Sequence, residues 1–91
     1  MTTIRIPPTL RSEVGGVREV EGQGSTVAEV LDDVVLRFPA LGPQLYRNGG
    51  LAPFVNVYVN GEDVRTLEGL DTAVGNGASL ILLPAVAGGR G

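Results

Sequence analysis

The alternating segment at residues 54–60, Phe-Val-Asn-Val-Tyr-Val-Asn, constrains the fold more than any other stretch of the chain. Valine occupies every second position, so a β-strand here would carry its valines on one face and Phe54 and Tyr58 on the other. Asn60-Gly61 follows directly, and an Asn-Gly pair between strands is the strongest two-residue signal for a hairpin. The chain is therefore expected to build a β-sheet whose valine face is covered by a second layer.

One helix can supply that layer. Thr26 followed by Glu29 has the spacing of a capping box, in which each residue hydrogen-bonds the backbone near the other. The residues that follow place apolar side chains on one helical face over about three turns: Val27, Val30, Leu31, Val34 and Phe38. Pro39 ends the helix, because the residue before a proline is pushed out of the helical conformation.

Further strands are predicted at both ends of the chain. Residues 2–6 alternate up to Pro7-Pro8, and residues 17–21 alternate again after a turn at residues 11–16, which favours a hairpin. The inward and outward register of residues 17–21 stays open. Residues 80–83, Leu-Ile-Leu-Leu, form a continuous apolar run that is typical of a central strand covered on both faces.

The remaining segments are predicted as connections. Residues 40–53 are expected to be mostly loop with one short helical turn. After the hairpin, residues 62–65 should return as a short strand. Leu67, Leu70 and Val74 are expected to cover one end of the core.

The resulting order, β-β-α-β-β-β, predicts an α+β domain at residues 1–83 with one helix on one face of a sheet. Its opposite face would stay partly open, and an apolar patch there suggests a surface for docking a partner. The candidate docking residues are Phe54, Tyr58, Ile81 and Leu83. A covering loop or an ordinary surface is the alternative.

Missing side chains limit the function more sharply than those present. The 91 residues include no cysteine, histidine or lysine. These absences exclude a thiol nucleophile, a Cys/His metal site, a Ser-His-Asp relay and a Schiff base. A net charge of −3 without a basic cluster argues against nucleic-acid binding. No segment resembles a membrane span or a secretion signal, so a cytoplasmic location is expected.

The carboxylates do not suggest catalysis either. Asp32-Asp33 and Glu62-Asp63 are the adjacent pairs. Neighbours in sequence do not share a helix face, so Asp32 and Asp33 should point apart. We expect all of these groups to be structural or solvated, and the chain not to be an enzyme.

The C-terminal tail, residues 84–91, reads Pro-Ala-Val-Ala-Gly-Gly-Arg-Gly and carries little side-chain bulk. Glycine has no Cβ, so such a tail can enter a narrow channel and bring a backbone carboxylate to another protein's active site. A frayed end with chance glycines is the competing interpretation, since glycine makes up 14 of the 91 residues.

This order of elements with a terminal glycine pair resembles the ubiquitin-like β-grasp fold. More narrowly, it is similar to the MoaD/ThiS sulfur-carrier family, above all to its actinobacterial CysO type. The likeness lies in Ile6-Pro7, Leu10-Arg11 and residues 54–60, 62–65 and 83–89. It implies a mixed sheet of about five strands, with the first and last strands parallel at the centre.

The resemblance also implies a mechanism in which partners supply the chemistry. An E1-like enzyme of the MoeB/ThiF type, using ATP and Mg, would bind the open face and draw in the tail. The tail residues in its active site would be Ala85, Val86, Ala87, Gly88 and Gly89. AMP would be transferred to the Gly89 carboxylate, and a sulfur donor would displace it to leave a thiocarboxylate. The CysO type further implies a cysteine synthase, acting on O-phosphoserine, as the sulfur-accepting enzyme.

The chain departs from the family at its end. Active carriers finish at the glycine pair, whereas Arg90-Gly91 follows Gly89 in this sequence. Trimming by a zinc-dependent protease of the JAMM type is the favoured interpretation. Activation of Gly91 itself, or an addition introduced by cloning, are the others.

Three other functions stay open at this point. The chain could be a ubiquitin-like protein modifier, although without lysine it cannot build chains on its own side chains. It could be the small subunit of a complex like molybdopterin synthase. It could also carry sulfur to a thiosugar or thiazole synthase.

Overall fold

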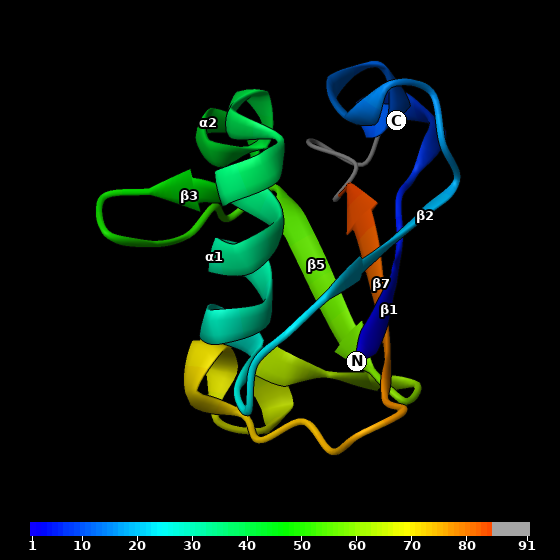
Figure 1. Cartoon of the computed structure of the whole chain (residues 1–91). Helices are drawn as coiled ribbons and strands as arrows, with labels where there is room; N and C mark the ends of the chain where they lie inside the picture. The colour runs from blue at the N-terminus through cyan, green and yellow to red at the C-terminus, as the bar shows by residue number, and fades with distance from the viewer. Residues whose placement is uncertain (85–91) are drawn as a thin grey trace.

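In the computed structural model, which describes residues 1–84, five strands form one mixed sheet and helix α1 (Val27–Arg37) lies on one of its faces (Figure 1). The strand order is β2-β1-β7-β5-β6. The strands are β1 Thr2–Arg5, β2 Glu19–Gly22, β5 Val55–Val59, β6 Glu62–Asp63 and β7 Ser79–Pro84. None of the helices within this part of the chain has the length and apolar character needed to cross a bilayer.

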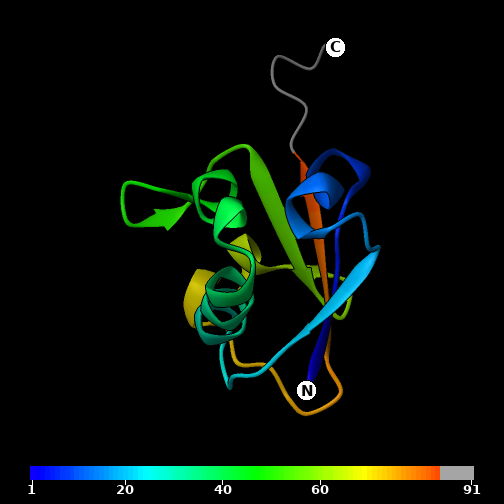
Figure 2. The ribbon, with the colours of Figure 1, turned by 45° about the horizontal axis from the view of Figure 1, so that its top comes forward.

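Strand β7 occupies the middle of the sheet. β1 pairs with it in parallel, with Ile4 opposite Leu80, and β5 pairs antiparallel, with Val57 opposite Leu82. Helix α1 lies to one side of these strands, as the tilted view shows (Figure 2). A helix held by a mixed sheet whose first and last strands are parallel neighbours is the ubiquitin-like β-grasp fold, as predicted.

The core lies between α1 and the sheet. All the valines of β5 are buried, which confirms that the alternating segment turns its valine face inward. The facing helix residues are at most 1% exposed: Val27, Val30, Leu31 and Val34. Each such side chain contributes roughly 1.5–3 kcal/mol by leaving water, which makes this face the main source of stability.

The cap of α1 follows the predicted capping box with one variation. Thr26 Oγ1 accepts a hydrogen bond from the Glu29 N–H at 3.2 Å. The returning carboxylate reaches Ser25, whose N–H and hydroxyl donate to Glu29 Oε1 at 2.8 and 2.9 Å. These bonds hold the pKa of Glu29 below its ordinary value of 4.5, the Ser25 N–H making the largest contribution.

Strand β2 and the turn after it approach α1 closely at two glycines. A Cβ on Gly22 would lie 3.0 Å from the Val30 carbonyl oxygen. A Cβ on Gly24 would lie 2.5 Å from Glu29 Cβ and 2.8 Å from the Val30 nitrogen. Real Cβ atoms are essentially never found as close as the contacts of Gly24, and the Gly22 contact is tighter than most. The helix therefore lies this close to Gly24 because that residue has no side chain, and Gly22 leaves little room for one.

The first hairpin differs in detail from the prediction. β2 begins at Glu19, and Val17 is 45% exposed before it. The predicted turn is mostly a 3₁₀-helix, η1 (Pro8–Val14), that buries Leu10 and Val14 in the core. Proline at its first position supplies the helical φ angle without leaving an unpaired N–H, which explains why it starts there.

Residues 40–53 are more ordered than the predicted loop. They contain the short helix α2 (Gly42–Leu45) and a second small sheet of β3 (Tyr46–Arg47) and β4 (Gly50–Leu51). Asn48 and Gly49 join the two strands with φ angles of 56° and 79°. This is the conformation that Asn-Gly favours in a hairpin, so the sequence did contain the signal.

Three further predictions were wrong in part. Only Glu62–Asp63 of residues 62–65 is a strand, and a 3₁₀-helix, Val64–Thr66, follows it. Of the residues expected to close the core, Val74 is buried and Leu70 packs against the core cluster. Leu67, in contrast, is 40% exposed. β7 is central, but it is covered on one face only: Leu82 is buried and Leu83 is 43% exposed.

The close approach of Gly24 to α1 predicts that Gly24→Ala destabilises the domain by about 1–3 kcal/mol, since the added methyl meets the helix backbone. Urea unfolding would measure this. Gly75→Ala is the matched control, because a Cβ there has no other atom within 4 Å. Equal stability of the two variants would contradict the packing argument.

The Glu29 cap predicts a pH dependence. Because the pKa of Glu29 is lowered in the folded chain, its charge stabilises the fold above pH 4.5, and that stabilisation is lost as the pH falls further. The wild-type protein should therefore exceed Glu29→Gln in unfolding free energy at pH 7, and the difference should shrink as the pH falls below 4.5. Glu62→Gln, at an exposed position, corrects for removing one negative charge. A gap that does not change with pH would contradict this role.

Candidate functional site

The candidate site is the edge of the sheet where β7 ends. Pro84, the last described residue, is paired with Val55 of β5, and Ile81 is paired with Arg5 of β1. The strand therefore continues one residue beyond the predicted domain boundary. The predicted tail residues Ala85, Val86, Ala87, Gly88 and Gly89, and the predicted processing residues Arg90 and Gly91, lie outside the described part of the chain.

Part of the predicted docking patch is brought together on the open face. Tyr58 of β5 lies directly opposite Ile81 of β7, and both are half-buried. Leu83 follows on the same face, because side chains alternate along a strand and Leu82 points into the core. These three side chains form a small apolar surface beside the start of the tail.

Phe54 is placed differently. It lies in the turn before β5, where it packs against the hydrophobic core. The guanidinium carbon of Arg47 lies 5.0 Å from the centre of its ring, a cation–π distance. Phe54 therefore supports the β3–β4 hairpin as well as the start of β5.

A polar clamp next to this surface was missed by the sequence analysis. Arg65 donates from Nη1 to Asn56 Oδ1 and from Nη2 to the Ala52 carbonyl, both at 2.8 Å. Asn56 is paired with Leu83 across the β5–β7 ladder. Arg65 thus holds β5 in place beside the end of β7. Only the tertiary structure brings Arg65, Asn56 and Ala52 into contact.

The sequence analysis also missed a hollow beside the end of β7, although it named two of the lining residues, Ile81 and Leu83, as docking residues. We call this hollow the β7 groove; it measures about 480 Å³ and lies between η1 and the end of β7, which are close together in both views (Figures 1 and 2). Its lining residues are Arg5, Ile6, Pro7, Pro8, Thr9, Arg11, Ile81, Leu82 and Leu83. Most of this lining is apolar, with two arginines as its charged groups.

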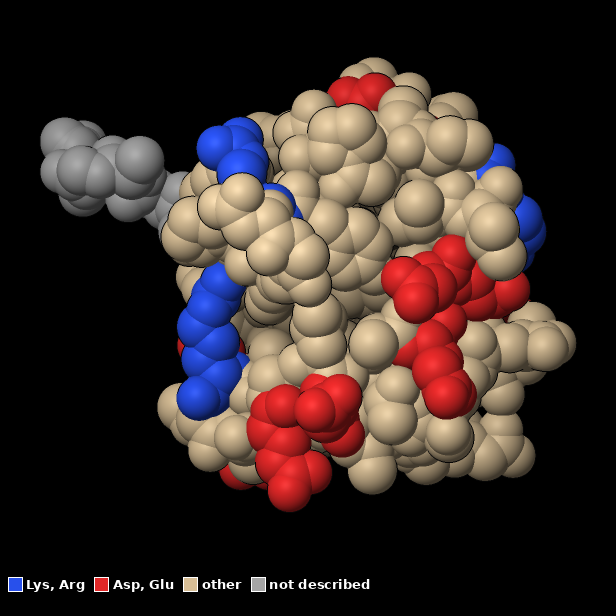
Figure 3. All heavy atoms as spheres, turned by 90° about the vertical axis from the view of Figure 1, so that its left-hand side faces the viewer, with Lys and Arg blue, Asp and Glu red and all other residues tan. Residues whose placement is uncertain are grey.

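A second hollow, of about 380 Å³, lies on the helix side, where acidic side chains gather in patches (Figure 3). The Tyr46 hydroxyl donates to Asp32 Oδ1 there at 2.8 Å. Burial, and then this bond to a carboxylate, raise the pKa of Tyr46 well above its ordinary value. A phenol in this state keeps its proton, so it serves as a donor that ties β3 to α1 rather than as a base.

The adjacent carboxylates have structural partners, as expected. Asp33 Oδ2 accepts from the Gln23 N–H and from Arg37. Asp63 Oδ1 accepts from the Arg65 N–H and caps Val64–Thr66. Within residues 1–84, no group of three or more His, Cys, Asp or Glu side chains is placed to hold a metal ion. The described site can position a tail but holds no nucleophile and base.

Comparison with known proteins agrees with this geometry. Residues 4–89 match the ThiS family. The sulfur carrier protein CysO of Mycobacterium tuberculosis (strain ATCC 25618 / H37Rv) is 42% identical over 90 residues, which are 96% of this chain and 97% of the relative.

Solved structures give the same result. The Amycolatopsis orientalis BexX/CysO complex contains a chain 46% identical to this one, with a TM-score of 0.92 over 98% of this chain and 100% of that chain. Small archaeal modifier protein 1 of Methanosarcina acetivorans is 28% identical, with a TM-score of 0.86 over 97% and 95%. The chain belongs to the ThiS/MoaD family and is a sulfur carrier protein of the CysO type, a carrier rather than an enzyme.

Proposed function

We propose that Gly89 is the residue that carries sulfur. An E1-like enzyme of the MoeB/ThiF type would bind ATP and Mg, and a carboxylate oxygen of Gly89 would attack the α-phosphorus, releasing pyrophosphate. A sulfur donor would then displace AMP from the acyl group and leave a thiocarboxylate. The observation that carries this proposal is the family match, which ends at Gly89 and leaves Arg90-Gly91 beyond it.

The described structure supports this role through the anchoring of β7. The tail starts from a strand that is hydrogen-bonded on both sides, so its starting point is fixed relative to the open face. From Pro84 an extended chain reaches roughly 20 Å by Gly89, enough to enter a buried active site. A carrier of this shape needs no acid–base residue of its own.

We propose cysteine synthesis as the destination of the sulfur, with a cysteine synthase that uses O-phosphoserine as the acceptor. The likeness to CysO of Mycobacterium tuberculosis supports this choice. A thiosugar or thiazole synthase is the second candidate for the acceptor. The complex of BexX with a CysO chain shows that a carrier 46% identical to this one associates with a separate protein.

A protein-modifier role is the alternative from another class. Its supporting observation is the likeness to small archaeal modifier protein 1. Both roles begin with the same activated glycine and separate only at the acceptor, which is a lysine of another protein for a modifier.

The channel argument predicts that Gly89→Val, in protein that ends at residue 89, abolishes ATP-dependent pyrophosphate release. The Cβ branch blocks a channel that admits only backbone. Pyrophosphate release by the E1-like enzyme would measure this, and circular dichroism would show that the domain stays folded. Gly75→Ala, in the same shortened protein, should be adenylated normally. Normal adenylation of Gly89→Val would overturn the assignment of Gly89.

The terminal residues predict a precursor. Mass spectrometry of the protein from its native cell should find a thiocarboxylate on chains that end at Gly89, after a JAMM-type protease has removed Arg90-Gly91. A thiocarboxylate on chains that retain Arg90-Gly91 would contradict trimming and favour activation of Gly91. Gly89 joined to lysines of other proteins would instead favour the modifier role.

A further inference from the structure

We propose that the β7 groove is a docking site for an acidic, partly apolar segment of the adenylating enzyme. Arg11 would bind a carboxylate of that segment, and Arg5 would attract it from the rim. This inference rests on the proposed function for the identity of the partner. The groove itself is defined by the described residues alone.

The groove lies where an enzyme that binds the tail would approach. Leu83 lines the groove and is followed by Pro84, from which the tail departs. An enzyme that takes up the tail therefore approaches the surface around this point. Ile81 belongs both to the groove and to the apolar patch with Tyr58, so one partner segment can contact the two surfaces together.

Arg11 is held ready to bind an anion. Its Nε donates to the Ile6 carbonyl oxygen at 3.1 Å in a partly buried position, which fixes the guanidinium plane against the wall of the groove. A guanidinium has five N–H donors. Among residues 1–84 the terminal nitrogens of Arg11 have no hydrogen-bond acceptor and no ion-pair partner. A carboxylate can accept from both of these nitrogens at once, which gives the strongest type of charged hydrogen bond.

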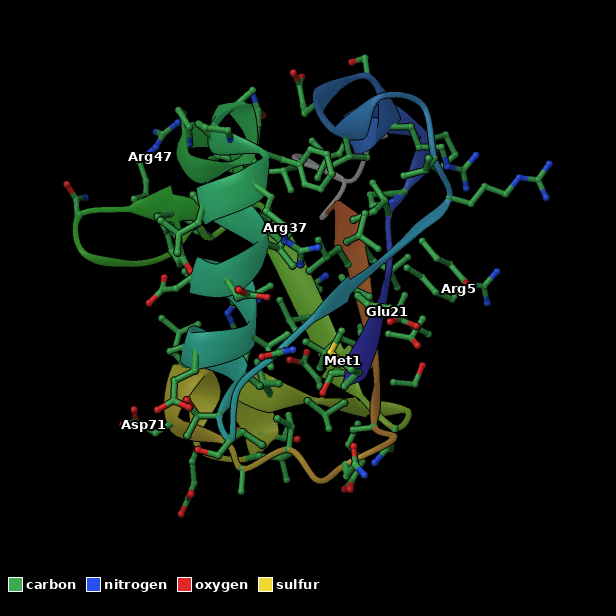
Figure 4. The ribbon with its side chains drawn as sticks, viewed as in Figure 1. Met1, Arg5, Glu21, Arg37, Arg47 and Asp71 are labelled. Carbon is green, nitrogen blue, oxygen red and sulfur yellow. The ribbon has the colours of Figure 1, made fainter. Side chains whose placement is uncertain are left out.

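Arg5 is the more exposed of the two cations. It points to the side of the sheet away from α1 (Figure 4). Within residues 1–84 its single ion pair, with Glu19, is long at 3.9 Å, and both side chains are more than half exposed. Such a pair contributes little, so Arg5 remains able to interact with an approaching charge.

The charge of the groove contrasts with that of the molecule. The chain has a net charge of −3, but the described lining of the groove includes two arginines and no Asp or Glu. The hollow on the helix side has the opposite character, since Asp32 is its only charged lining residue among those described. Complementary charges guide association and suppress wrong orientations. An acidic segment would thus be directed to the end of the molecule from which the tail emerges.

The test measures binding of full-length variants to the adenylating enzyme without ATP, by biolayer interferometry. Arg11→Glu should raise Kd about tenfold or more, mainly through faster dissociation, because it removes a partly buried charge contact. Arg5→Glu should slow association at low salt, with an effect that disappears at high salt. Arg47→Glu is the matched control, since Arg47 lies on the β3–β4 hairpin outside the groove and should leave Kd unchanged.

The outcomes separate this inference from the proposed function. If the wild-type protein binds the enzyme but no pyrophosphate is released when ATP is added, the proposed role of Gly89 is contradicted and the docking proposal is not. The docking proposal would be overturned if both Arg5→Glu and Arg11→Glu bound with wild-type affinity. Tighter binding of either variant, or no binding of the wild-type protein, would also overturn it. Nuclear Overhauser contacts between residues 85–91 and Thr9 or Arg11 in the free protein would show that the chain's own tail fills the groove, which would also overturn it. Arg5→Glu keeps the test valid if Arg11→Glu fails to fold.

Discussion

The two hydrogen-bonded ladders that hold β7 between β1 and β5 position everything else in this molecule. They bury Leu80 and Leu82 beneath α1 and leave Ile81 and Leu83 on the opposite face. The last described strand is therefore hydrogen-bonded on both sides. The tail starts from a point that is fixed relative to the rest of the sheet.

The same ladders make the fold strongly non-local. Ile4 near one end of the sequence pairs with Leu80 near the other, so the sheet cannot close until almost the whole chain is present. Contacts of this kind slow folding because a long loop must be ordered first. The close packing of Gly22 and Gly24 against α1, by contrast, joins residues that are near one another in sequence.

How far the sequence could predict this structure depended on whether a signal was local. The Thr26–Glu29 cap, the valine face of β5 and the turn at Asn60-Gly61 were all predicted, because each depends on a few neighbouring residues. The Asn48-Gly49 hairpin carried the same kind of signal and was overlooked. The helix at Pro8–Val14 was not readable as such, since its buried Leu10 and Val14 acquire their role only from packing. The Arg65 clamp and the β7 groove join residues that are far apart in sequence, so no local pattern indicates them.

The sequence by itself determined that this chain has no cysteine, histidine or lysine to perform covalent chemistry, and that residues 84–91 carry little side-chain bulk. Those properties follow from residue types and need no coordinates. Tertiary structure decided which of the apolar residues stay exposed, and it placed Arg5 and Arg11 beside Leu83 at the start of the tail. The physical reason is that burial and charge proximity depend on strand pairing across the whole chain, which brings η1 next to the end of β7.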